Sequence, residues 1–258
     1  MTSIDGLFRL DGKTALITGG GRGIGKTIAE AYLQSGARVA ITGRRAEYLD
    51  AAVAEFKEQG FDCVSIIADV ATSEGVTTAV EKAVAALGPI DILVNNAGQT
   101  WGQASEDVSL DKWRRILEVN LTGVFAMSQA IGRMMLESKQ GGHIINIASV
   151  AGFTAGDAES LRTAAYNTSK AGVIHLTRSL ALEWGRAGIL VNAIAPGWFP
   201  TRMASATIEA NRDRLENSAA LGRVGDLDEL KGVAIFLASR ASSFVTGQTI
   251  VVDGGSLL

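Results

Sequence analysis

Short runs of consecutive apolar residues recur along the whole chain, separated by longer amphipathic segments. The runs are rich in Val, Ile, Leu and Ala and show little polar alternation, which is typical of strands covered on both faces of a parallel sheet. We expect strands at 14–18, 38–42, 63–68, 90–94, 143–148, 189–195 and 249–252.

The segments between these runs carry apolar residues three and four positions apart, which predicts helices that pack by one face. Gly36, Gly60 and Gly88 stand shortly before the next strands, where helices commonly end. We expect helices after Gly25 and over about 46–59, 73–87, 109–136, 164–185 and 226–238. The most polar irregular stretch covers about 198–226, and we expect a mobile lid there.

Strands that alternate with helices predict an α/β fold with a doubly wound parallel sheet of about seven strands, joined by right-handed crossovers and flanked by helices. A length of 258 residues fits one large domain over residues 1–258 better than two small ones.

Composition narrows the range of partners. The net charge of -3 argues against nucleic acid as a partner, because such proteins usually carry a basic surface. The single cysteine, Cys63, excludes an internal disulfide framework and is expected to be buried and inert. His143 and His175 have no metal-ligand partners at useful spacing, so no metal site is expected. With no long apolar run and no apolar leader, we expect a cytoplasmic protein that does not enter membranes.

The first predicted strand runs into TGGGRGIG, Thr18 to Gly25, and a helix follows. Glycines permit a tight turn and a close approach of the backbone to a pyrophosphate, while the helix N-terminus offers free N–H groups. Glycine-rich strings also occur in ordinary turns. The position between the first strand and the first helix of an α/β alternation favours dinucleotide binding.

The order of motifs resembles that of the short-chain dehydrogenase/reductase family over nearly the whole chain. The glycine loop fits its TGxxxGxG pattern, and the family's later motifs follow in order. These are Asn95-Asn96-Ala97-Gly98, Asn120, Ser149, Tyr166 with Lys170, Pro196-Gly197 with Thr201, and Asp253-Gly254-Gly255.

The resemblance implies a Rossmann-like fold, a nicotinamide cofactor and a catalytic set of Asn120, Ser149, Tyr166 and Lys170. In the family, the lysine also holds the nicotinamide ribose, and the asparagine anchors a water that feeds a proton relay. The resemblance implies cofactor contacts from the glycine loop, namely Thr18, Gly19, Arg22, Gly23, Ile24 and Gly25. It places Asp69 and Val70 at the adenine, and Asn95 and Gly98 towards the ribose. Further implied contacts are Ala97, Tyr166, Lys170, Pro196, Gly197 and Thr201.

The end of the second strand indicates which nicotinamide cofactor is preferred. An acidic residue usually stands about 20 positions after the glycine loop and binds the adenosine ribose hydroxyls. Here Gly43, Arg44 and Arg45 occupy that region, and Arg22 lies in the loop itself. A guanidinium binds a 2′-phosphate in bidentate fashion, so we expect NADP(H) over NAD(H). The alternative is that these arginines are solvated surface charge.

Tyr166 and Lys170 are one helical turn apart and therefore share a face. A phenol titrates near 10, and a neighbouring ammonium is expected to lower its pKa, so that it exchanges a proton with a substrate oxygen. Ser149, at a strand end, is expected to hydrogen-bond the same oxygen. Without such a structural context, a tyrosine–lysine pair at this spacing is usually an exposed pair with no catalytic role.

The spacer from Ser149 to Tyr166 is longer than in the resembling family, by about four residues, which a loop accommodates at little cost. We place the extra residues in GDAESLRT, and its polar residues Asp157, Glu159, Ser160 and Arg162 either help to choose the substrate or form a solvated bulge.

Several residues are candidates for contacts with the substrate. Trp101, Trp198 and Phe199 follow motif residues and either wall the pocket or pack elsewhere. The resemblance extends to gluconate 5-dehydrogenases and 3-oxoacyl thioester reductases. A sugar acid needs cations, for which Arg162 and Arg202 are candidates, whereas an acyl chain needs an apolar groove, to which Met203 would add.

Further alternatives are a broad-specificity carbonyl reductase and a non-catalytic NADP(H)-binding sensor or scaffold. The sensor is disfavoured because Asn120, Ser149, Tyr166 and Lys170 are all present. The substrate is expected to be a small carbonyl or alcohol. The resemblance also implies a homo-oligomer, a tetramer or a dimer, in which the helix carrying Tyr166 packs against another subunit.

Overall fold

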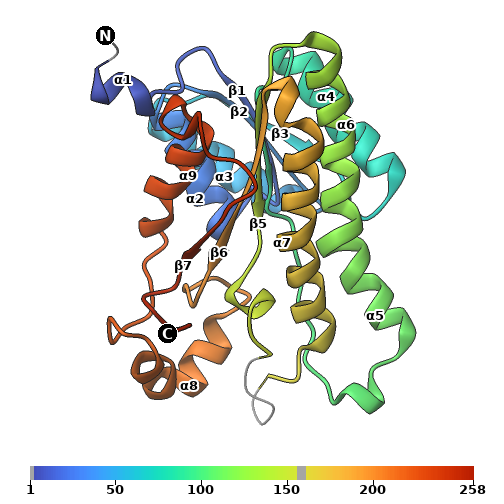
Figure 1. The fold of residues 1–258 in the computed structure, drawn as a ribbon, viewed down its shortest axis with the longest axis vertical. Coiled ribbons are helices and arrows are strands. Elements are labelled where there is room, and N and C mark those ends of the chain that lie inside the picture. The colour runs from blue at the N-terminus through green and yellow to red at the C-terminus, as the bar shows by residue number, and fades with distance from the viewer. Residues whose placement is uncertain (1–2, 156–160) are drawn as a thin grey trace.

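A parallel sheet of seven strands lies at the centre of the molecule, in the order β3-β2-β1-β4-β5-β6-β7 (Figure 1). The computed structural model describes residues 3–155 and 161–258. The strands are β1 (Thr14–Thr18), β2 (Arg38–Gly43), β3 (Cys63–Ile67), β4 (Ile92–Asn95), β5 (Gly142–Ile147), β6 (Ile189–Pro196) and β7 (Thr249–Val252). The predicted doubly wound α/β sheet is confirmed.

Helices cover both faces of this sheet (Figure 1). One layer contains α2 (Gly23–Gln34), α3 (Ala46–Glu58) and α9 (Glu229–Ala238), and the other contains α4 (Ser73–Leu87), α6 (Gly123–Ser138) and α7 (Ala164–Trp184). The remaining α-helices of the described residues are α1 (Ile4–Phe8), α5 (Leu110–Leu117) and α8 (Ser205–Ser218). None of the helices in the described ranges combines the length and apolar character needed to cross a bilayer.

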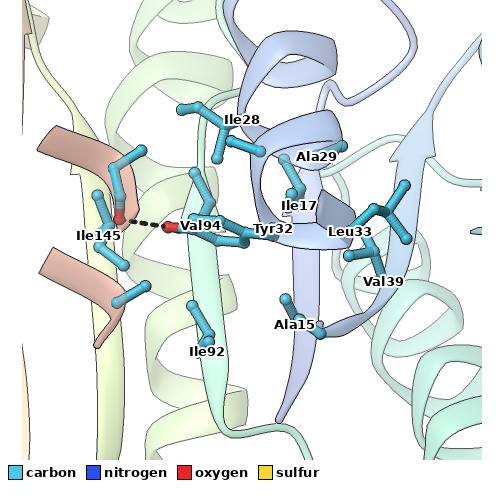
Figure 2. Close-up of a cluster of buried hydrophobic side chains, with 14 of the residues drawn as sticks. Ala15, Ile17, Ile28, Ala29, Tyr32, Leu33, Val39, Ile92, Val94 and Ile145 are labelled. Carbon is cyan, nitrogen blue, oxygen red and sulfur yellow. Dashed lines mark hydrogen bonds between the residues drawn. The ribbon is translucent and has the colours of Figure 1, made fainter. Parts of the chain in front are cut away.

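Tyr32 on α2 shows how the first layer is joined. Its ring is fully buried against residues of β1 and β4, among them Ile17 and Val94 (Figure 2). Its hydroxyl donates to the carbonyl oxygen of Ala234 on α9 at 3.1 Å, which satisfies the polar tip of a buried aromatic side chain. Tyr32 therefore links α2 to α9, the helix packed on the same face of the sheet.

A chain of buried polar side chains runs through the second layer. Asn95 at the end of β4 donates to Ser128 Oγ on α6 and to Asn146 Oδ1 on β5, both at 2.9 Å. Asn146 in turn donates to Thr177 Oγ1 on α7 at 3.0 Å. Buried polar groups are stable only when they are hydrogen-bonded, so this chain fixes α6 and α7 against the sheet in one arrangement.

Two predicted elements differ from the structure. The helix expected over 109–136 is interrupted by a π-helical stretch, Glu118–Thr122, between α5 and α6. The stretch expected to be irregular, 198–226, contains α8, which buries only Ile208 and Leu215. A helix that buries so few apolar residues leaves a weak periodic signal, which is why the pattern failed to predict it.

Candidate functional site

A cavity of about 860 Å³ opens at the carboxyl ends of the strands, and loops that follow β1 to β6 all contribute to its lining. The strand order places β1 beside β4, so the chain winds outwards to β3 and then returns to the other side of β1. Open α/β sheets bind their ligands at such a point, outside the carboxyl ends of the strands.

The loop after β1 has the backbone that a close approach of a ligand requires. Gly19 and Gly23 adopt φ values of 67° and 51°, which residues with a Cβ rarely adopt. A Cβ at Gly25 would lie 2.4 Å from Asn96 Nδ2, which donates to the carbonyl oxygens of Thr18 and Gly19 at 2.9 and 3.0 Å. Asn96, in the motif at the end of β4, therefore holds the glycine loop in place through its side-chain hydrogen bonds.

Thr18 and Asn95 stabilise the structure around the glycine loop, although neither lines the cavity. Thr18 Oγ1 accepts from the backbone N–H groups of Asn96 and Ala97, both at 3.0 Å. The side chain of Asn95 points into the buried polar chain, and the expected contact between Asn95 and the ribose stays a prediction. Successive residues of an extended chain face opposite sides, so Asn95 faces α6, while the next residue, Asn96, lines the cavity. Ala97 and Gly98, which follow the strand, also line it.

One end of the cavity is rich in charge. Asp69, which follows β3, accepts from Arg115 Nη2 at 3.2 Å, lies 3.8 Å from Arg44 Nη1, and accepts from the N–H of Ala71 at 3.1 Å. Asp69, Val70 and Arg44, which the sequence predicts at the adenosine of the cofactor, all line the cavity, and we call this part of it the adenosine end. The carboxylate is balanced by two guanidiniums, so it does not oppose the binding of an anion nearby.

Tyr48, in the first turn of α3, is surrounded by three further arginines. The guanidinium carbons of Arg22, Arg45 and Arg202 lie 4.6, 5.6 and 5.6 Å from the centre of its ring. Its hydroxyl accepts from Arg45 Nη1 at 3.2 Å and from Arg202 Nη1. We call Tyr48 with these three arginines the arginine cluster. Its residues line the same end of the cavity as Arg44.

The three chemical groups expected at the reacting end come together. Ser149 follows β5, and its hydroxyl accepts from the N–H of Ala151 at 3.2 Å and acts to lower the pKa of Tyr166. Tyr166 stands in the first turn of α7, and Lys170 Nζ lies 5.7 Å from the centre of its ring. Lys170 also donates to the carbonyl oxygen of Ile147 at 2.6 Å. Two hydroxyls and one ammonium therefore meet at the cavity wall.

The expected effect of Lys170 on the pKa of Tyr166 does not appear in this structure. Burial raises the pKa of Tyr166, and its hydrogen bond with Ser149 opposes that rise only in part. Burial also lowers the pKa of Lys170, to about 8. Because the ammonium points to a backbone carbonyl, the main influence on the phenol here is desolvation.

Asn120 lies in the π-helical stretch, fully buried. Its amide accepts from the N–H of Gln99 and donates to the carbonyl oxygen of the same residue, both at 2.9 Å, and it donates to Ser169 Oγ at 3.1 Å. A Cβ at Gly98 would lie 3.6 Å from Asn120 Oδ1 and 3.8 Å from Lys170 Nζ. The amide thus fixes the backbone after β4 beside the lysine.

The end of β6 and the segment after it also line the cavity, through Pro196, Gly197, Trp198 and Thr201. Phe199 also touches the cavity but is only 4% exposed and packs into the core beside α9, so it is mainly a core residue.

Residues 99–103 and the end of the lengthened loop lie against each other. The N–H of Gln103 donates to the carbonyl oxygen of Arg162 at 2.9 Å, and a Cβ at Gly102 would lie 2.8 Å from the carbonyl oxygen of Leu161. Leu161 and Thr163 line the cavity, so the end of this loop forms part of the wall. Asp157, Glu159 and Ser160 lie outside the described residues.

Two candidate substrate residues make other contacts in the structure. Trp101 is 44% exposed, lies under Lys112 Nζ at 4.0 Å from its ring centre, and donates to Gln103 Oε1 at 2.9 Å. Arg202 reaches the arginine cluster at the adenosine end. In its place, Arg214 on α8 brings a cation to the cavity lining.

Sequence reasoning missed Tyr48 and Gly102, and it named Asn96 in a motif without giving it a role. Tyr48 lies four residues after Arg44 at the start of a predicted helix, and that position beside the vacant acidic site was the available signal. The contacts of Asn96 with Thr18 and of Gly102 with Leu161 join segments far apart in the chain, and no local pattern reveals them.

Cys63 and His143 show no sign of chemistry. Burial raises the pKa of Cys63 to about 12, which keeps the thiol protonated. His143 Nδ1 pairs with the carbonyl oxygen of Leu237 at 2.9 Å, and burial lowers its pKa. Within residues 3–155 and 161–258, no group of three or more His, Cys, Asp or Glu side chains is arranged to hold a metal ion.

The donors around the cavity fit a dinucleotide that carries an additional phosphate. The glycine loop leaves room for a diphosphate at the start of α2, and Arg22, Arg44, Arg45 and Arg202 offer planar donors that match phosphate oxygens. Ser149 follows β5, whereas Arg44 and Arg45 follow β2, and β1 and β4 lie between these two strands in the sheet. Tyr166 and Lys170 line the cavity together with Ser149.

Comparison with known proteins gives consistent relatives. A family model described as enoyl-(acyl carrier protein) reductase matches residues 19–256. The chain is 40% identical to a gluconate 5-dehydrogenase of Gluconobacter oxydans (strain 621H) over 253 residues, 96% of each chain. It is 38% identical to a 3-oxoacyl-[acyl-carrier-protein] reductase of Aquifex aeolicus (strain VF5) over 249 residues, 96% of this chain and 98% of the relative.

Among solved structures, the chain is similar to a gluconate 5-dehydrogenase from Burkholderia cenocepacia J2315, crystallised in complex with NADP and tartrate. The TM-score is 0.92 with 41% identity, and the match covers 99% of both chains.

Proposed function

Because the chain belongs to the short-chain dehydrogenase/reductase family and is therefore an oxidoreductase, we propose that it interconverts a ketone and a secondary alcohol with NADP(H) in preference to NAD(H). The observation that carries the proposal is that Ser149, Tyr166 and the buried Lys170 line one cavity, whose lining also includes the arginine cluster.

The protein's own groups move and hold the proton. In the reducing direction, the Tyr166 hydroxyl transfers its proton to the carbonyl oxygen of the substrate, and Ser149 donates a hydrogen bond to that same oxygen. In the oxidising direction, Tyr166 accepts the proton of the alcohol. NADP(H), when bound, supplies or accepts the hydride. Lys170 holds positive charge near the phenolate that remains after proton transfer, which stabilises it.

Asn120 and Asn96 have positioning roles in this scheme. Asn120 keeps the backbone around Gln99 and Gly98 close to Lys170, and Asn96 holds the glycine loop at the start of α2. We propose that Gly19, Gly23 and Ile24 lie against the diphosphate, Val70 against the adenine, and Arg44 with Arg22 at the 2′-phosphate. All six line the cavity.

The lining of the reacting end supports a polyhydroxylated substrate such as a sugar acid. Hydroxyl and amide side chains gather there, namely Thr100, Thr154, Thr163, Asn167 and Thr207, and Arg214 adds a cation. Such groups bind the hydroxyls and the carboxylate of a sugar acid. The similarity to two gluconate 5-dehydrogenases is consistent with this class.

A 3-oxoacyl thioester is the second candidate substrate class. Leu161, Trp198, Met203 and Leu215 form an apolar part of the same lining, which would accept an acyl chain. The family model and the Aquifex relative are named for acyl-carrier-protein substrates.

Initial rates at the NADPH absorbance band over a substrate panel test the proposal. The panel holds 5-ketogluconate with gluconate, acetoacetyl thioesters and simple aryl ketones, each with NADP(H) and NAD(H). Tyr166→Phe serves as the blank, and we expect it to lower kcat by about 10²- to 10⁴-fold, the usual contribution of a general acid. Turnover that is indifferent to Tyr166 would refute the proposed proton transfer, and tight NADPH binding with no turnover would favour a sensor.

A homo-oligomer, dimer or tetramer, is part of the proposal. Leu182 on α7 is 86% exposed, and Phe125 and Leu136 on α6 are 41% and 38% exposed. These exposed apolar side chains, on the helix that carries Tyr166 and on α6, support the use of the two helices as a subunit contact. Light scattering of the purified protein measures the mass directly, and a monomer would refute this part.

A further inference from the structure

Arg202 makes its contact at an unexpected place. It lies in the segment 198–204 that follows β6, next to residues that line the reacting end of the cavity. Its guanidinium nevertheless donates to the hydroxyl of Tyr48 on α3, 154 positions away in the chain, and lies 5.6 Å from the ring centre. The segment therefore reaches from the reacting end to the adenosine end.

A second contact joins the same two parts of the chain. A Cβ at Gly23 would lie 3.3 Å from Thr201 Cγ2, so Thr201 is seated against the glycine loop. Arg22, next to Gly23, lies over the same Tyr48 ring at 4.6 Å. At the other end of the segment, Met203 lines the cavity. Thr201 and Arg202 thus hold the segment against the glycine loop and α3.

The positive charge of the arginine cluster favours the binding of an anion. Three guanidiniums lie around one neutral phenol, and like charges this close repel one another. Arg45 also approaches Glu47, at 3.7 Å, but that carboxylate is exposed. Burial acts to raise the pKa of Tyr48, yet hydrogen bonds from Arg45 and Arg202 outweigh it and the pKa lies below its usual value. The cluster therefore stabilises negative charge.

We propose that Arg202 binds the 2′-phosphate of NADP(H) together with Arg22 and Arg45, that Tyr48 positions these guanidiniums, and that the phosphate thereby fixes the segment 198–204 over the substrate. The inference rests on the proposed use of NADP(H) and adds a link between the two ends of the cavity. Choice of cofactor would then also change the affinity for the substrate, because NAD(H) has only a hydroxyl at this position.

Fluorescence titration of NADPH and NADH tests the binding part. We expect Arg202→Gln to raise the Kd of NADPH roughly tenfold, because one charge-assisted bond is lost, and to leave the Kd of NADH within about twofold. Tyr48→Phe keeps the ring and removes the acceptor of Arg202, so a smaller shift in the same direction is expected. Arg212→Gln is the matched control, because Arg212 lies on the next helix, is exposed and pairs with Glu216 at 3.0 Å.

Hydrogen exchange tests the link. NADPH should protect amides of 198–204 more than saturating NADH does, and Arg202→Gln should remove that difference. With NADPH at saturation, the same variant should raise the KM of the substrate. An unchanged Kd of NADPH in Arg202→Gln, or equal protection by both cofactors, would overturn the inference.

The two proposals fail in different ways. If wild-type protein binds NADH as well as NADPH, the proposed cofactor preference fails and this inference fails with it. If wild-type protein prefers NADPH, and Arg44→Gln weakens that preference while Arg202→Gln does not, then only the role of Arg202 is refuted.

Discussion

Lys170 Nζ and the carbonyl oxygen of Ile147 are joined by a hydrogen bond of 2.6 Å, which fastens the second turn of α7 to the end of β5. Ser149 follows two residues after Ile147, and Tyr166 precedes Lys170 by one helical turn. The same contact therefore fixes the spacing between the Ser149 and Tyr166 hydroxyls. Lys170 is only 4% exposed, so the contact holds a cation in a dry environment.

This buried cation makes stability depend on pH in a definite direction. The pKa of Lys170 is lowered to about 8 in the folded protein, from 10.5. Between these values the unfolded chain binds more protons, so the contribution of Lys170 to the free energy of unfolding rises with pH. The change amounts to roughly 3 kcal/mol at most, since each unit is worth about 1.4 kcal/mol.

Replacing Lys170 by Met removes this dependence. We expect the stability of Lys170→Met relative to wild type to decline as pH rises from about 8 to about 10.5. Urea unfolding at a series of pH values measures the difference. Lys57→Met, at an exposed position of α3, is the control and should show a difference that stays constant. A constant difference for Lys170→Met would contradict the buried cation.

Arg44→Gln should reduce the preference for NADP(H). Arg44 lines the adenosine end and lies 3.8 Å from Asp69, so its loss removes a donor for the 2′-phosphate. We expect the ratio of kcat/KM for NADPH over NADH to fall roughly tenfold. Lys57→Gln removes the same charge away from the cavity and should leave the ratio unchanged. The same ratio in both variants would show that Arg44 is solvated surface charge.

Gly102→Ala tests whether the lengthened loop shapes the reacting end. A Cβ at Gly102 would come within 2.8 Å of the carbonyl oxygen of Leu161, so the wall made by Leu161 and Thr163 must shift. We expect the KM of the substrate to change several-fold, about 1 kcal/mol, while the Kd of NADPH stays constant. Gly185→Ala, where a Cβ meets open space, is the control. An unaltered KM and substrate profile would assign the loop no role in specificity.

Asn95→Ala separates support of the fold from contact with the cofactor. The side chain of Asn95 joins Ser128 and Asn146 in the buried polar chain, and its removal leaves Asn146 Oδ1 without that donor. We expect the free energy of unfolding to fall by about 1–3 kcal/mol, the cost of an unsatisfied buried polar group. The Kd of NADPH at a temperature where the variant is folded should be unchanged. A large rise in that Kd with no loss of stability would support the ribose contact.

The elements with strong local signals could be predicted from sequence. Alternation of apolar runs with amphipathic segments was enough for the parallel sheet, because strands buried on both faces have to be apolar throughout. The glycine loop and the Tyr166–Lys170 pair were found for a similar reason. Turn geometry limits the residues that a ligand loop accepts, and helical spacing places residues four apart on one face. The family was recognisable from the order of these motifs.

Other features depend on which distant segments meet. Packing against helices and strands elsewhere in the chain determines three such features. They are the direction of the Asn95 side chain, the burial of Phe199 and the rise in the pKa of Tyr166. α8 was missed because it buries little apolar surface of its own.

Arg202 shows the difference between sequence and structure most directly. Its place in the chain, after Pro196-Gly197, made it a candidate for the substrate, since sequence position reports only which residues are neighbours along the chain. The folded segment turns its guanidinium to Tyr48, and side-chain length, burial and the electrostatics of the arginine cluster fix that contact. The sequence determined the fold and the kind of chemistry. Only the tertiary structure decided which charges share one end of the cavity, because that arrangement depends on contacts across 154 positions of chain.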